Sequence, residues 1–267
     1  MQMKNSLFLV AVFLLTAHVH LWGEDKITLP SKEKFYLVLM IGQSNMAGRG
    51  FVTEEDKIPF PRVFMLNRAG EWVPATDPVH YDKKSAGVGM GRTFARLMTE
   101  MSPDIAVGLI PAACGGSSLE SWKSGVYFKG TRSNPYDDAV ARAKKAMESG
   151  TLKVILFHQG EGDCKPGKDV QYEKRLVELI RNLRKELNAE QVPLLIGELS
   201  SWSRWNKSKV MVDAAHHAAV EQLQPATFVS ARGLTPNPDK IHFDRKSQLI
   251  FGERYFKAYQ ELLKKNP

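Results

Sequence analysis

The sequence has little cysteine, no long apolar segment and no internal repeat. Its 267 residues include only two cysteines, so the chain is not a disulfide scaffold. The longest apolar run, residues 6–17, is much shorter than the roughly 20 residues that a membrane-spanning helix needs. No low-complexity stretch or linker divides the remainder. These features predict a fold that depends on an ordinary hydrophobic core, which a chain of this length can build.

The N-terminus is typical of a secretory signal peptide. Lys4 precedes the apolar run and polar residues follow it. We therefore expect residues 1–23 to be a signal peptide, cleaved after Ala17 or Gly23, and residues 24–267 to form a single domain. The alternatives are a buried element of the domain and a retained N-terminal anchor. The expected location is periplasmic or secreted.

The two cysteines, Cys114 and Cys164, permit two interpretations. An oxidising compartment allows a disulfide between them, and the other possibility is two buried free thiols. The formal net charge is +8, but the basic residues are scattered and are not interleaved with aromatic residues. We therefore expect no nucleic-acid partner and no stable membrane partner. The oligomeric state stays open.

Apolar strands alternate with amphipathic helices along the chain. The expected buried strands are residues 34–42, 105–112, 152–159, 193–199 and 226–231. The expected helices are residues 88–101, 134–150, 171–188, 209–223 and 245–265. This alternation predicts an α/β protein with a three-layer α/β/α, flavodoxin-like fold and a central parallel sheet of about five strands. Residues 50–90 break the alternation and are expected to form a hairpin or a long inserted segment.

Polar segments follow several of the predicted strands. They are Gly42-Gln43-Ser44-Asn45, residues 114–118, residues 158–163 and, beyond the last strand, residues 239–242. The carboxyl ends of parallel strands meet at one edge of an open sheet, where ligands bind. Ser44 read alone favours a helix N-cap, but the other segments make a nucleophile the better interpretation.

A serine hydroxyl needs a base to take its proton and a third group to orient that base. His242 is the candidate base, and Asp239 lies three residues before it, within reach of the far imidazole nitrogen. Glu161 is a second carboxylate near the same edge and is the alternative partner of His242. Backbone N–H groups at Ser44 and at a glycine of residues 115–116, with a side-chain amide, would stabilise the oxyanion.

Four motifs in order, GQSNM, the GGS loop, HQGEGD and D-x-x-H-F, resemble those of the SGNH-hydrolase superfamily. The sequence is most similar to its carbohydrate acetylesterases, namely acetylxylan esterases of carbohydrate esterase family 6 and sialate O-acetylesterase-like proteins. The resemblance implies that Ser44 is the nucleophile, His242 the base and Asp239 its partner. It also implies an oxyanion hole made by Ser44, Gly116 and Gln159. Gln159 stands in for the Asn of the G-x-N-D motif of the wider superfamily.

The expected function is a serine esterase that hydrolyses O-acetyl esters of carbohydrates, of the acetylxylan or sialate type, through an acetyl-enzyme. No cofactor and no metal are expected. The alternatives are a cell-envelope O-acyltransferase and a catalytically silent carbohydrate-binding protein. Residues 162–168 match a phosphate-loop pattern, but Asp169 follows where that loop needs Ser or Thr. Trp122, Trp202 and Trp205 are either platforms for sugar rings or ordinary loop packing.

Overall fold

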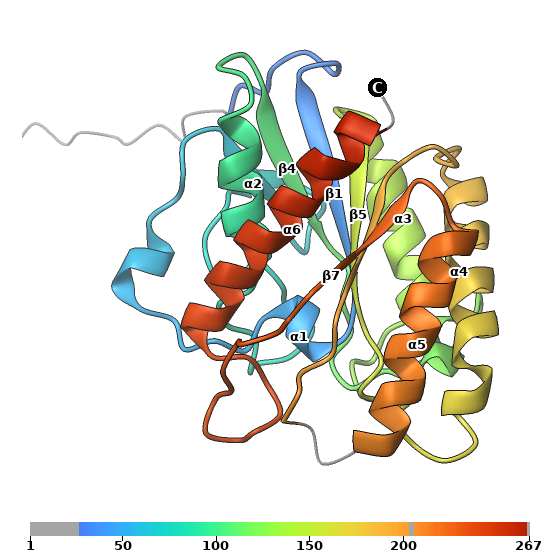
Figure 1. The fold of residues 1–267 in the computed structure, drawn as a ribbon. Coiled ribbons are helices and arrows are strands. Elements are labelled where there is room, and N and C mark those ends of the chain that lie inside the picture. The colour runs from blue at the N-terminus through green and yellow to red at the C-terminus, as the bar shows by residue number, and fades with distance from the viewer. Residues whose placement is uncertain (1–26, 203–205, 266–267) are drawn as a thin grey trace, which may run out of the picture.

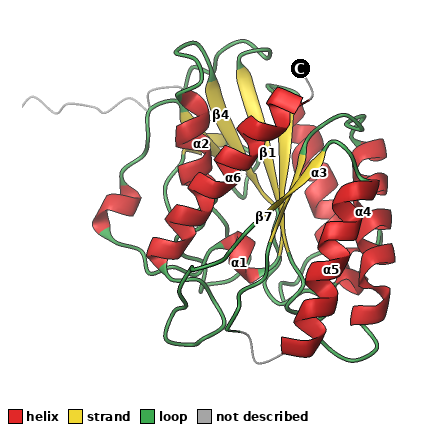
Figure 2. Cartoon of the chain, in the orientation of Figure 1, coloured by secondary structure: helices red, strands yellow, loops and turns green. Residues whose placement is uncertain are grey.

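A seven-stranded sheet lies between two layers of helices in the computed structural model, which describes residues 27–202 and 206–265 (Figures 1 and 2). The predicted signal peptide lies outside the described residues. The sheet order is β3-β2-β4-β1-β5-β6-β7. The strands are β1 (Phe35–Gly42), β2 (Val63–Leu66), β3 (Trp72–Pro74), β4 (Ala106–Pro111), β5 (Thr151–His158), β6 (Leu194–Gly197) and β7 (Ala226–Val229).

The α-helices cover both faces of this sheet. They are α1 (Ser44–Ala47), α2 (Gly91–Thr99), α3 (Pro135–Met147), α4 (Tyr172–Glu186), α5 (Asn206–Gln222) and α6 (Arg245–Lys265). Short 3₁₀ turns are η1 (Glu54–Lys57), η2 (Leu119–Trp122) and η3 (Asp169–Gln171). Helices α3, α4 and α5 pack on one face, and α2 and α6 on the other (Figure 1). Among the described residues, no helix has the length and apolar character needed to cross a membrane.

The predicted fold class is confirmed, and the strand count is corrected. The five predicted strands form the parallel core of the sheet, β4-β1-β5-β6-β7, which is the flavodoxin-like order. The count is seven because residues 50–90 contain the expected hairpin, β2–β3. Strand β2 pairs parallel to β4 and thereby extends the sheet at that edge. Both added strands are short, with four residues in β2 and three in β3, so their apolar residues do not form a run long enough to predict a buried strand.

The central strand shows why both faces must be covered. In β1, Phe35, Leu37, Leu39 and Ile41 belong to the core under α3, α4 and α5, whereas Val38 and Met40 belong to the core under α2 and α6. Alternate side chains of a strand point to opposite faces of the sheet. A continuous apolar strand therefore requires helices on both sides, as the sequence pattern indicates.

Strand β1 ends in a turn that only glycine can make. Gly42 has a φ of +134°, and a Cβ at this position would lie 2.1 Å from the carbonyl oxygen of His158. The next backbone N–H, at Gln43, donates to that carbonyl at 2.9 Å. The close approach of β1 to the end of β5 thus places Gln43 and Ser44 at the carboxyl edge of the sheet.

Candidate active site

Ser44, His242 and Asp239 form a hydrogen-bonded chain. Nε2 of His242 lies 2.9 Å from Oγ of Ser44, and Nδ1 of His242 lies 2.7 Å from Oδ2 of Asp239. Ser44 is the first residue of α1, directly after β1, whereas the other two residues come from the loop before α6. The structure therefore brings Ser44 against a pair of residues that lies almost the whole length of the domain away from it in the sequence. This arrangement can transfer a proton from a serine hydroxyl to an imidazole.

The loop from Asp239 to His242 is held by its own carboxylate. Oδ1 of Asp239 accepts hydrogen bonds from the backbone N–H groups of Ile241 and His242, at 2.8 and 2.9 Å. Partial burial disfavours the charged form, but the hydrogen bonds from the His242 amide and imidazole outweigh it and lower the pKa of Asp239. Asp239 is therefore a carboxylate at neutral pH, as a group that orients an imidazolium must be.

A cavity of about 330 Å³ surrounds the Ser44 hydroxyl. Its lining residues are Gln43, Ser44, Arg49, Lys83, Ser85, Gly115, Gly116, Glu161, Gly162, Lys165, Ile241 and His242. Arg49 is buried and forms an ion pair with Asp82 at 2.8 Å. Lys83 and Lys165 are exposed and have no acidic partner among the residues that the structure describes. The rim therefore carries two ammonium groups that form no ion pair within the described part of the chain, and Glu161 is the carboxylate that lines the same cavity.

Glu161 lines this cavity but does not contact the imidazole of His242. Its Oε1 accepts a hydrogen bond from Nδ2 of Asn45 at 2.6 Å and lies 3.8 Å from Nδ1 of His158. Asp239 therefore contacts the imidazole of His242, and Glu161 contacts Asn45 instead.

Gln159 lies away from the cavity, in contrast to its predicted place in the oxyanion hole. Its side chain is fully buried, and Nε2 donates to Oδ2 of Asp163 at 2.6 Å and to the carbonyl of Ser117 at 3.0 Å. Its Oε1 accepts from the hydroxyl of Tyr172 at 2.7 Å. With both amide hydrogens engaged in the protein interior, Gln159 is a structural residue beneath the site.

Gln43 is the functional candidate that sequence reasoning missed. Its Oε1 accepts from the backbone N–H of Gly162 at 3.1 Å, from Nε2 of Gln159 at 3.3 Å and, at a longer 3.5 Å, from Gly160. Its own Nε2 donates to no acceptor in the described part of the chain, and the residue lines the cavity beside Ser44. Because the carbonyl end is fixed by these donors, the amide nitrogen is the end left for the cavity.

Gly116 provides a second free donor. Its φ of +83° favours glycine, and within the described residues its backbone N–H has no acceptor. The neighbouring Gly115 differs, because its N–H donates to Oδ2 of Asp82 at 2.8 Å. Asp82, which also pairs with Arg49, therefore holds the glycine loop against the cavity wall.

The structure also places the two cysteines and two of the three tryptophans singled out in the sequence. Cys114 and Cys164 are buried free thiols, and burial raises the pKa of both. Trp122 is buried, with its Nε1 donating to Ser117, and Trp202 packs edge-on against Phe243. Trp205 lies outside the described residues.

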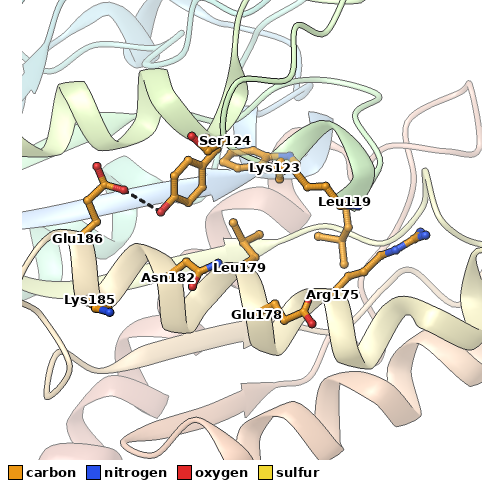
Figure 3. A pocket seen from close by; sticks show the side chains of 11 residues that line it. Leu119, Lys123, Ser124, Arg175, Glu178, Leu179, Asn182, Lys185 and Glu186 are labelled. Carbon is orange, nitrogen blue, oxygen red and sulfur yellow. Dashed lines mark hydrogen bonds between the residues drawn. The ribbon is translucent and has the colours of Figure 1, made fainter.

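A second, larger cavity lies away from the Ser44 hydroxyl (Figure 3). It has a volume of about 490 Å³ and lies along η2, α3 and α4. Charges of both signs line it, and the hydroxyl of Tyr136 donates to Oε2 of Glu186 at 3.0 Å. Volume alone would favour this cavity, but of the two cavities only the smaller one is lined by a serine hydroxyl in contact with a histidine.

The three-layer fold, with polar residues gathered at the carboxyl ends of its parallel strands, is that of the SGNH-type esterases. Residues 34–261 match the family model described as carbohydrate esterase, sialic acid-specific acetylesterase. The chain belongs to this family and is a carbohydrate acetylesterase, a carboxylic ester hydrolase.

Known proteins agree with this assignment. The probable carbohydrate esterase At4g34215 of Arabidopsis thaliana is 30% identical over 260 residues, which are 89% of this chain and 95% of the relative. The crystal structure of that protein superposes with a TM-score of 0.75 at 27% identity, covering 86% of this chain and 98% of the other. NanS is more distant in sequence and shows the shared fold, with a TM-score of 0.70, 16% identity and coverage of 89% and 100%.

Proposed function

We propose that this protein is a serine esterase that removes O-acetyl groups from carbohydrates through an acetyl-enzyme on Ser44. The observation that carries the proposal is the continuous hydrogen-bonded chain from the Ser44 hydroxyl through His242 to Asp239, with distances of 2.9 and 2.7 Å. A hydroxyl that opens into a cavity and contacts an oriented imidazole is suited to nucleophilic attack.

Each residue of this chain has a defined step. Oγ of Ser44 attacks the acetyl carbonyl as Nε2 of His242 takes the hydroxyl proton. The imidazolium is stabilised by Asp239 and returns the proton to the sugar oxygen, which leaves as an alcohol. A water molecule then gives a proton to His242 and attacks the acetyl-enzyme, and the second tetrahedral intermediate releases acetate and regenerates Ser44.

Three donors are available for the negative charge of each tetrahedral intermediate. They are the backbone N–H groups of Ser44 and Gly116 and the side-chain amide of Gln43. Gln43 takes the role that the sequence motif suggested for Gln159. Its amide is preorganised, because the Gly162 N–H and its other donors fix the orientation of its carbonyl end.

The charge of the cavity rim favours an anionic substrate. Lys83 and Lys165 have no acidic partner among the described residues, so a carboxylate on the sugar would be attracted to this rim. We therefore propose an acetylated sialate-type sugar over neutral acetylated xylan. The basic and apolar N-terminal segment supports the further proposal that the protein is exported.

Acetate release tests the proposal directly. The substrates are acetylated sialic acid, acetylated xylan and a chromogenic aryl acetate, each with the wild type, Ser44→Ala and the exposed control Ser124→Ala. We expect Ser44→Ala to lose activity on every substrate that the wild type and Ser124→Ala hydrolyse. Hydrolysis at the wild-type rate by Ser44→Ala would refute the nucleophile. A double Lys83→Ala/Lys165→Ala variant should lose about tenfold in kcat/KM on the anionic sugar and little on the neutral substrates.

A further inference from the structure

Asn45 links three segments of the site that are far apart in the sequence. It follows Ser44 in α1, and its side chain is fully buried and does not line the cavity. Its Oδ1 accepts a hydrogen bond from the backbone N–H of Phe243 at 3.1 Å, and its Nδ2 donates to Oε1 of Glu161 at 2.6 Å. Its backbone carbonyl accepts from Nε2 of Gln248, at 3.1 Å.

The two ends of the Asn45 amide have different partners, and this defines its orientation. The Phe243 N–H requires the oxygen end, and the carboxylate of Glu161 requires the nitrogen end. Phe243 directly follows His242, so the hydrogen bond from its N–H determines where the histidine loop lies relative to the nucleophile turn. A rotated amide would place a donor against the Phe243 N–H and an acceptor against the carboxylate.

Glu161 accepts no hydrogen bond from His158, which lies behind it. Its Oε1 lies 3.8 Å from Nδ1 of His158, beyond hydrogen-bond distance, and Nε2 of His158 contacts the carbonyl of Glu198 at 3.1 Å. Its other oxygen, Oε2, is buried without a hydrogen-bond partner among the described residues. A buried carboxylate in such surroundings gains most from the one strong donor that it has, the Asn45 amide.

We propose that Glu161 and Asn45 are positioning residues that place His242 against Ser44. Glu161 orients the amide of Asn45, and Asn45 then holds the backbone next to His242 at the distance that proton transfer needs. This inference rests on the proposed serine mechanism. It explains why a second carboxylate stands near the site without contacting the imidazole.

Reversing the polarity of the hydrogen bond tests this proposal. Asn45→Asp keeps an acceptor for the Phe243 N–H but places a second carboxylate next to that of Glu161. The two carboxylates repel each other, so we expect the histidine loop to shift and kcat to fall by about 100-fold with little change in KM. Glu161→Gln leaves an acceptor for Asn45 and should stay within about tenfold of the wild type. The double variant, Asn45→Asp with Glu161→Gln, restores a donor–acceptor pair with the direction of donation reversed. It should recover kcat to within about tenfold of the wild type.

The matched control is Glu178→Gln with Asn182→Asp. These exposed residues lie on α4 and line the second cavity (Figure 3). Their single and double variants should keep wild-type kcat. Should Asn45→Asp fail to fold, as circular dichroism would reveal, Glu161→Ala takes its place: it leaves Asn45 without its acceptor and should lower kcat more than Glu161→Gln does.

Two outcomes would overturn the positioning role. One is wild-type kcat in folded Asn45→Asp or in Glu161→Ala, and the other is a double variant as slow as Asn45→Asp alone. Ser44→Ala measured in the same assay separates this failure from failure of the mechanism. If Ser44→Ala is inactive while folded Asn45→Asp is fully active, only the positioning proposal is lost.

Discussion

Replacing Gln43 with glutamate removes one proposed oxyanion donor and keeps the contacts that hold the side chain. Oε1 of Gln43 accepts from Gly162 and Gln159, and a glutamate oxygen can accept the same hydrogen bonds. Only the amide nitrogen facing the cavity is lost, and an oxygen takes its place. The substitution should therefore destabilise the transition state of the reaction more than it destabilises the folded protein.

The size of the effect follows from the chemistry of an oxyanion hole. Removal of one such donor costs about 2.7–4 kcal/mol of transition-state stabilisation, which is about a 10²–10³-fold fall in kcat. The added negative charge next to the developing oxyanion places Gln43→Glu at or beyond the upper end of this range. KM should change little, because the charge develops only during the reaction.

The assay is steady-state hydrolysis of the aryl acetate and the acetylated sugar, with urea unfolding to check stability. Gln43→Met serves as the comparison, because it removes both ends of the amide. It should lower kcat and also lose about 1–3 kcal/mol of unfolding free energy, since the half-buried Gly162 N–H loses its acceptor. A kcat for Gln43→Glu within threefold of the wild type would refute the donor role of Gln43.

Three further predictions concern the orientation of the base, the β1 turn and the dependence of stability on pH. Asp239→Asn should lower kcat by about 10³–10⁴-fold in the acetate-release assay, because the correct tautomer of His242 loses its acceptor; a loss below tenfold would contradict this. Gly42→Ala should lower the unfolding free energy by at least about 3 kcal/mol, since the alanine Cβ would lie 2.1 Å from a backbone oxygen. An unfolding midpoint in urea equal to that of the wild type would contradict this steric clash. Burial lowers the pKa of His80 to about 4, from 6.5, so its contribution to stability is present above pH 6.5 and is lost as the pH falls towards 4. This loss amounts to about 3 kcal/mol. Between pH 7 and 4, the unfolding free energy of His80→Gln in urea should therefore fall by less than that of the wild type. An equal fall of the unfolding free energy in both proteins would exclude His80 as the cause.

The sheet core and the three residues of the hydrogen-bonded chain were predictable from sequence. The apolar segments of β1, β4 and β5 each end in polar residues, and the parallel connection rule places those ends at one edge. Asp239 and His242 are close in sequence, so their contact is local. The strands β2 and β3 were harder to define, because short edge strands bury few side chains and leave a weak pattern.

The places of Gln43 and Gln159 could not be predicted. Both are glutamines beside glycines at strand ends, and nothing in the sequence distinguishes a buried amide from one that faces a cavity. The signal that could have pointed to Gln43 is its position directly before Ser44. The choice between them depends on which groups surround each amide. Gln159 donates to Asp163, four residues away, and to the carbonyl of Ser117, which comes from another strand-end loop.

By itself the sequence determined the alternation of strands and helices and the residue types available for acyl transfer, because these depend on local periodicity and short spacing. Only the tertiary structure decided that Glu161 contacts Asn45 and not His242, and that the Gln43 amide and not the Gln159 amide is left for the cavity. The physical reason is that a hydrogen bond is decided within about 3 Å, and packing sets distances of that size between segments more than a hundred residues apart.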